Sequence, residues 1–82
     1  MKLVLVEWED SLGCSSQWQA LDGVQAPKPL LCQSVGWLLH DGKDCKVVVP
    51  HVTRDHANAS RQGCGDMTIP TKAITKIKTL KT

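Results

Sequence analysis

Two short stretches of this chain carry side chains that suit the binding of a nucleotide. Trp8 is followed by Asp10 and Ser11, so an indole that can stack on a base stands beside groups that can bond its edge. Thr53 and Arg54 lie in a later polar stretch, where a guanidinium can hold phosphate oxygens in pairs and a hydroxyl can add a neutral donor. We therefore expect ligand-binding chemistry at these five positions.

Trp18 and Gly36 complete the candidate ligand-binding set. Trp18 stands among polar residues and offers a second stacking surface. Gly36 interrupts a strand-like run, which lets a ligand or a neighbouring subunit approach the backbone. Each has a structural alternative, because the three tryptophans of a chain without Phe or Tyr can plug a small core, and Gly36 can be a bulge that curves a sheet. A solvated surface loop equally explains the polar residues around Arg54.

The sequence contains no arrangement typical of a metal or catalytic centre. Zinc sites use cysteine and histidine at compact spacings, whereas the two cysteines nearest in sequence are Cys32 and Cys45. His51, His56 and Cys64 can meet across a loop, but nothing in the sequence orients them. No activating base is specified for Ser11 or for any cysteine. We therefore expect no metal, no cofactor and no enzymatic activity.

Length and charge limit the remaining classes. A chain of 82 residues is expected to form one domain, residues 1–82, which buries only about 60–65% of its unfolded surface. Self-association, disulfides or a metal must supplement so small a core, and we expect a homo-oligomer. The net charge is +2 with both signs scattered along the chain, which does not favour a nucleic-acid partner.

The N-terminal segment predicts a protein of the cytoplasm. Only four apolar residues separate Lys2 from Glu7, too few for a signal-peptide core or a membrane span. A membrane partner is therefore not expected. In a reducing compartment all four cysteines are expected to be free thiols, namely Cys14, Cys32, Cys45 and Cys64.

The first third of the chain predicts a strand followed by a long loop. Residues 2–9 form the strand, with Val4, Val6 and Trp8 on one face and Leu3 and Leu5 on the other. Residues 10–29 are rich in turn-forming types and predict a loop with a helical turn near residues 17–21. The apolar anchors of this loop are expected to be Leu12, Trp18, Leu21 and Val24.

A β-hairpin is the strongest local signal. Residues 34–49 contain two β-prone runs around Asp41-Gly42, where Gly42 can adopt the positive φ that a tight turn needs. The run 47–49 is expected to cover the core together with three residues of the first run, Val35, Trp37 and Leu39.

The C-terminal third predicts a second long loop and two closing strands. Residues 50–65 are polar and predict the loop, residues 67–69 a strand, Pro70 a short turn, and residues 74–80 a last strand. The alternative is a C-terminal helix, since Ile74, Ile77 and Leu80 also fit a spacing of three. The preferred fold is mainly β, a small five-stranded SH3-like or Sm-like barrel with two long loops and a short helical turn.

Three segments resemble a group of small proteins encoded by tailed bacteriophages. They are residues 6–11 (VEWEDS), residues 34–38 (SVGWL), and Ile69-Pro70 followed by Ala73-Ile74 and Ile77. The resemblance implies that the protein acts in the cytoplasm of an infected host, by binding rather than by catalysis. Several small phage proteins of this general kind are similar in role to sponges, oligomers that sequester cyclic nucleotides or related signals made by bacterial immune systems, and by this analogy we expect an anti-defence role.

Three functions therefore remain open at this point. The first is a homo-oligomeric phage protein that sequesters a small nucleotide-type signal. The second is a nucleic-acid-binding module of Sm-like type, which the weak charge does not favour. The third is an interaction module that binds a host or virion protein through an exposed strand edge.

Overall fold

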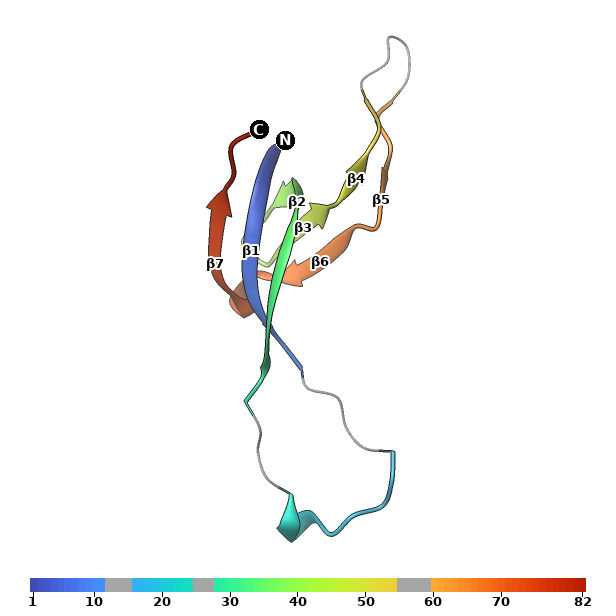
Figure 1. Ribbon diagram of the computed structural model, residues 1–82, viewed down its shortest axis with the longest axis vertical. Coiled ribbons are helices and arrows are strands. Elements are labelled where there is room, and N and C mark those ends of the chain that lie inside the picture. The colour runs from blue at the N-terminus through green and yellow to red at the C-terminus, as the bar shows by residue number, and fades with distance from the viewer. Residues whose placement is uncertain (12–15, 25–27, 55–59) are drawn as a thin grey trace.

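The fold is mainly β, as the sequence predicts. A computed structural model describes residues 1–11, 16–24, 28–54 and 60–82 (Figure 1). Within these residues the strands are β1 (Lys2–Asp10), β2 (Leu30–Asp41), β3 (Cys45–Val49), β4 (His51–Val52), β5 (Gly63–Cys64), β6 (Met67–Pro70) and β7 (Ile74–Thr79). Two 3₁₀ turns accompany them, η1 (Leu21–Gly23) and η2 (Thr71–Ala73).

Five strands form one antiparallel sheet in the order β6-β3-β2-β1-β7, and β4 pairs with β5 in a separate ribbon. The edge strands β6 and β7 are joined by η2, whose three residues span only about 6 Å. In a flat sheet these two edges would lie about 19 Å apart. The sheet therefore curls, which Figure 1 shows as β6 and β7 meeting at η2.

The curled sheet does not close into a barrel, which corrects the expectation of a closed five-stranded barrel. In the described part of the chain no ladder joins β6 to β7. Instead η2 is tied to the β2–β3 turn, since the Thr71 N–H donates to the Asp44 carbonyl at 2.9 Å and its hydroxyl to the Gly42 carbonyl at 3.1 Å. Pro70 at the end of β6 has no N–H with which to extend a ladder.

A small apolar cluster holds the sheet. Val4, Val6, Val48 and Ile69 are its buried members, and partly buried neighbours pack against them, namely Trp8, Leu38, Ala73 and Ile74. The predicted alternation of β1 is confirmed, and the structure shows that the face with Val4, Val6 and Trp8 is the one that turns toward the core.

The expected inward face of β2 is wrong by one residue. Val35 pairs with Leu5 and Trp37 with Leu3, so they lie on the outer face, and Val35 remains 52% exposed. Leu39 is exposed as well. Apolar residues occur on both faces of β2, so alternation alone cannot select the register.

Two glycines show what the turns and the core require. Gly36 lies inside β2 without a bulge beside it, and a Cβ there would stand 2.6 Å from Val48 Cγ1 and 2.9 Å from the Val49 carbonyl oxygen. The neighbouring strand β3 is what approaches Gly36. The expected positive φ at Gly42 is wrong, since among the described glycines only Gly65 has one, at 78°.

The two long connections differ from expectation. The first carries the 3₁₀ turn η1, later than predicted, and its expected anchors Trp18, Leu21 and Val24 are exposed, while Leu12 lies outside the described residues. The second is not simply a loop, because β4 and β5 form a ribbon within it. The alternative C-terminal helix is wrong, since η2 and β7 occupy that segment.

The molecule is elongated, with extents of 61 × 24 × 21 Å. Its radius of gyration is 17.2 Å, against about 12 Å for a compact chain of this length. Its accessible surface is 6,948 Å², whereas a compact monomer of 9.0 kDa exposes about 4,900 Å². About 2,000 Å² of additional surface is therefore open to partners.

Candidate functional site

The most distinctive feature of the sheet is that one side of β2 lacks a partner strand over the first part of its length. Residues Trp37–Asp41 of β2 pair with β3, but Leu30–Gly36 continue past the end of β3. The cause is Pro50, which lacks the N–H needed to prolong the ladder and follows the last residue of β3. The chain then turns away into β4, so in the described structure β2 has β1 on one side of Leu30–Val35 and no strand on the other, while Gly36 still packs against the end of β3.

This open edge presents unpaired backbone groups to solvent. In an antiparallel strand every second residue directs its N–H and C=O to the same side, and β1 uses only the groups that face it. The side chains beside the edge are apolar, since Leu31 is 76% exposed and Val35 is 52% exposed on the outer face. The edge therefore offers both hydrogen-bonding groups and apolar contact.

The other edges of the sheet carry features that discourage pairing, and the β2 edge does not. β7 bears Lys76 and Lys78, and β6 is only four residues long and ends in Pro70. Lysines, prolines and short length are the usual protections of exposed strand edges. Leu30–Gly36 (LLCQSVG) contains no charged residue and no proline. This contrast marks the β2 edge as the one suited to a partner strand.

A hollow of about 210 Å³ lies beside the open edge. Its lining comes from β2, β3, β6 and the bends that join β3 to β4 and β5 to β6, namely Ser34, Val35, Val48, Pro50, Gly65 and Met67. Gly65 stands at its wall in a left-handed conformation, and a Cβ there would lie 3.1 Å from the Pro50 ring. The hollow is large enough for one apolar side chain of a strand laid along β2.

Trp8, the leading candidate for base stacking, is held by the sheet. It is half-buried against the core cluster, and its indole N–H donates to the Ser34 hydroxyl at 3.0 Å. Asp10 and Ser11 are exposed where β1 ends, and the Asp10 carboxylate accepts the Ser11 backbone N–H at 2.8 Å. Trp8 therefore has a structural contact in addition to its predicted ligand role, which stays a prediction.

Thr53 and Arg54 directly follow β4, at the end of the β4–β5 ribbon. The Thr53 hydroxyl accepts the Gln62 N–H at 2.8 Å, and the Thr53 carbonyl accepts a bond from Arg61 Nε at 3.0 Å. Figure 1 places this ribbon on the opposite side of the sheet from the end of β1. The structure thus brings Asp10 and Ser11 together, and separately Thr53 and Arg54, but it does not bring these two groups to one rim.

Trp18 and Gly36, the remaining predicted site residues, also lie apart. Trp18 is fully exposed in the segment 16–24, which Figure 1 shows hanging below the sheet. Gly36 is buried in the middle of β2 against β3. Neither residue lines the hollow of the β4–β5 ribbon, to which Thr53 belongs.

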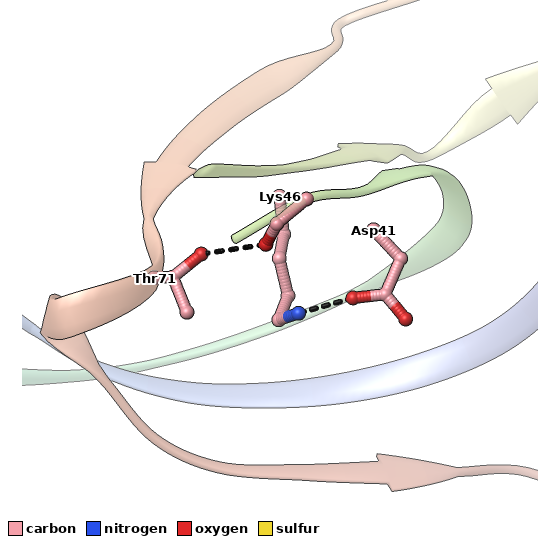
Figure 2. Close-up of polar contacts among 4 residues, drawn as sticks. Asp41, Lys46 and Thr71 are labelled. Atoms are coloured by element: carbon pink, nitrogen blue, oxygen red, sulfur yellow. Dashed lines mark hydrogen bonds and ion pairs between the residues drawn. The ribbon is translucent and has the colours of Figure 1, made fainter. Parts of the chain in front are cut away.

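An ion pair stands at the end of the sheet where β2 turns into β3. Figure 2 shows Lys46 donating to the Asp41 carboxylate beside the Thr71–Gly42 bond. The hydrogen bond from Lys46 and the positive charge of its ammonium group hold the pKa of Asp41 below its ordinary value. The carboxylate therefore stays ionised and available as an acceptor at neutral pH.

Cysteine and histidine residues do not form a metal-binding cluster in the described segments. Cys32, Cys45 and Cys64 are free thiols, and Cys14 lies outside the described residues, as does His56. No group of three or more His, Cys, Asp or Glu residues in the described ranges is placed to hold a metal ion.

Of the open edge and its hollow, only Gly36 is among the predicted site residues. The sequence places Ser34, Val35 and Met67 in strands and Pro50 in a loop. A signal was nevertheless present, because an uncharged run of seven residues precedes the hairpin turn, and Pro50 limits the length of its partner strand.

None of the helical turns in the described residues is long and apolar enough to cross a membrane. Comparisons of the chain with protein-family models, curated proteins and solved structures found no match. The resemblance to tailed-phage proteins therefore stays a prediction.

Proposed function

We propose that this protein is a non-enzymatic interaction module that binds an extended segment of a partner protein by strand addition along β2. The observation that carries the proposal is the open edge Leu30–Gly36, uncharged and free of proline, in a sheet whose other edges bear lysines or end in proline. An incoming strand takes the place that β3 leaves vacant after Val49. Its backbone groups pair with the free groups of β2.

The hollow beside the edge supplies side-chain selection. In strand addition, main-chain hydrogen bonds give affinity and pockets for alternate side chains give specificity. The hollow is lined by the apolar residues Val35, Val48 and Met67 and by the polar residue Ser34. We therefore expect a preference for a partner segment with one apolar side chain at the position that faces this hollow.

Sequestration of a nucleotide-type signal, the first function expected from the sequence, has less support. The Trp8 indole N–H already donates to the Ser34 hydroxyl, and Arg54 follows β4 of the ribbon whereas Asp10 and Ser11 lie at the end of β1. One protomer thus offers no single place for a base and its phosphate among the predicted residues. The action of the protein in a phage-infected cytoplasm stays a prediction from the resemblance alone.

A peptide library displayed on phage and selected against the full chain tests the strand-addition proposal. We expect the selected peptides to be uncharged and extended, with one preferred apolar residue, and to protect backbone amides of residues 30–36 from hydrogen exchange. Val35→Lys should weaken their binding at least tenfold, because a lysine fills the hollow and discourages pairing at that edge.

His40→Lys is the matched control for this experiment. His40 is also exposed on β2, but it lies in the half already paired with β3. Its substitution should leave peptide binding unchanged. Peptides that bind Val35→Lys as well as the wild type, or that protect another part of the chain, would contradict the proposal. The nucleotide alternative is tested by calorimetric titration with a 3′,3′-linked cyclic dinucleotide. Measurable binding of this ligand would favour that alternative.

A further inference from the structure

The segment 16–24 carries apolar side chains that the described part of the chain leaves uncovered. Trp18 is 103% exposed and Leu21 is 84% exposed, although tryptophan is highly buried on average. Figure 1 shows this segment, here called the arm, hanging from the end of the β1–β2 pair and pointing away from the sheet. Tryptophan in such a position is the residue type most enriched among the anchors of protein interfaces.

The opposite end of the sheet has a hollow that suits an indole. Its volume is about 370 Å³, within the range of about 300–1,000 Å³ for sites that take small ligands. Val4, Leu38 and Ile77 provide apolar lining, and Lys2 and Asp41 lie at the same hollow. The ionised Asp41 can accept the indole N–H, and the Lys2 ammonium group can lie over an aromatic face.

We propose that the arm of one copy of this chain docks in the hollow of a second copy, with Trp18 as the anchor. The arm cannot serve its own hollow in this conformation, because β1 runs about 30 Å from Lys2 at the hollow to Asp10 at the base of the arm. The arm then continues in the same direction, away from the hollow (Figure 1).

A two-fold dimer satisfies both arms at once. Two copies side by side in antiparallel orientation place each arm beside the hollow of the other, which gives a closed assembly with two identical contacts. The surface is sufficient, because the chain exposes about 2,000 Å² more than a compact monomer, and one partner of a standard interface contributes about 800 Å². This contact is separate from the open edge of β2.

Sedimentation equilibrium of the full chain in reducing buffer tests the dimer. The wild type should be a dimer at micromolar concentrations, and Trp18→Ala should weaken it about a thousandfold. The reason is that an anchor residue carries about thirtyfold in affinity and the dimer contains two such contacts. The fluorescence of Trp18 is the difference between the emission of the wild type and that of Trp18→Ala. It should shift to the red when the wild type is diluted to monomer, because Trp18 then becomes exposed to water.

A mixing experiment separates docking from a merely structural role of Trp18. Ile77→Lys blocks the hollow and keeps the arm, whereas Trp18→Ala keeps the hollow and lacks the anchor; each alone should be monomeric. Their mixture should recover a heterodimer of intermediate affinity, because one intact contact remains. Thr79→Arg, at an exposed residue of the same hollow, replaces Ile77→Lys if that variant fails to fold. Val35→Lys should keep the dimer.

A wild type that sediments as a monomer at micromolar concentrations would overturn the proposal. So would a Trp18→Ala variant with the dimer affinity of the wild type, or a mixture of the two variants that stays monomeric.

Discussion

The curled sheet and the arm use the same kinds of residue in opposite ways. In the sheet, Val6 and Ile69 are buried almost completely by side chains that come from β1, β3 and β6. In the arm, Trp18 and Leu21 lie in water beside the 3₁₀ turn η1, in which the Gly23 N–H donates to the Ala20 carbonyl and the Val24 N–H to the Leu21 carbonyl. Stability therefore resides in the sheet, and the arm offers uncovered apolar surface for association.

The same difference explains how the molecule can be stable with so small a core. Most contacts within the sheet join strands that are distant in sequence, and they place the four buried residues of the cluster around one another. The arm contributes nothing to this cluster. Substitutions in the sheet should consequently change the free energy of unfolding, and substitutions in the arm should change association.

The largest difference is expected at Ile69. Ile69→Ala should lower the free energy of unfolding by about 2–5 kcal/mol, because it removes a buried side chain and leaves a cavity among Val4, Val6 and Val48. Leu21→Ala in the arm should change it by no more than about 0.5 kcal/mol. Urea unfolding followed by tryptophan fluorescence measures both.

Both substitutions should be made in the Trp18→Ala background, so that dimer dissociation does not contribute to the unfolding curve. If Ile69→Ala is unfolded without urea, Ile69→Val supplies the graded test, with an expected loss of about 0.5–1.5 kcal/mol. Equal losses at Ile69 and Leu21 would contradict the division between sheet and arm.

Two glycines give a sharper comparison of packing. Gly36→Ala should destabilise the protein by about 1–3 kcal/mol, since the new Cβ meets Val48 Cγ1 at 2.6 Å and the Val49 backbone at 2.9 Å. Gly23→Ala in the arm meets nothing within 4 Å, so it should be neutral or stabilise by up to about 1 kcal/mol. Thermal unfolding at a fixed protein concentration compares the two, and a stable Gly36→Ala variant would show that β2 and β3 are less closely packed than described.

The smallest effect is expected at the ion pair of Asp41 and Lys46. Because the pKa of Asp41 is lower in the folded protein, the pair stabilises the fold above the ordinary pKa of an aspartate, about 3.9, and this contribution is lost as the pH falls through the lowered pKa. Asp41→Asn should therefore lose a little stability at neutral pH and show a weaker acid dependence below about pH 4.

The loss at neutral pH should shrink further in high salt, because exposed charges are screened. Asp22→Asn in the arm is the control for the removal of one exposed carboxylate outside the ion pair. If the free energy of unfolding falls equally with decreasing pH in Asp41→Asn and in the wild type, the ion pair does not contribute to the stability of the sheet.

The sequence by itself determined the elements that depend on local chemistry. Alternation in residues 2–9 correctly predicts β1 and the division of its side chains between two faces, and the β-prone runs around Asp41-Gly42 predict the hairpin of β2 and β3. Pro70 correctly predicts the short turn before a last strand. These features follow from side-chain period and from the fixed φ of proline, which act within a few residues.

Only the tertiary structure decided which face of β2 is buried, whether the sheet closes and which residues meet. Val35 and Leu38 are both apolar, and the choice between them depends on pairing with β1 and β3, which are distant in sequence. The structure does not bring Trp8 and Arg54 to one rim for the same reason, because Trp8 lies in β1 against the core cluster whereas Arg54 follows β4, which belongs to a separate ribbon. The open edge of β2 arises where Pro50 ends one strand and its longer partner continues, a difference in length that appears only once the two strands are paired.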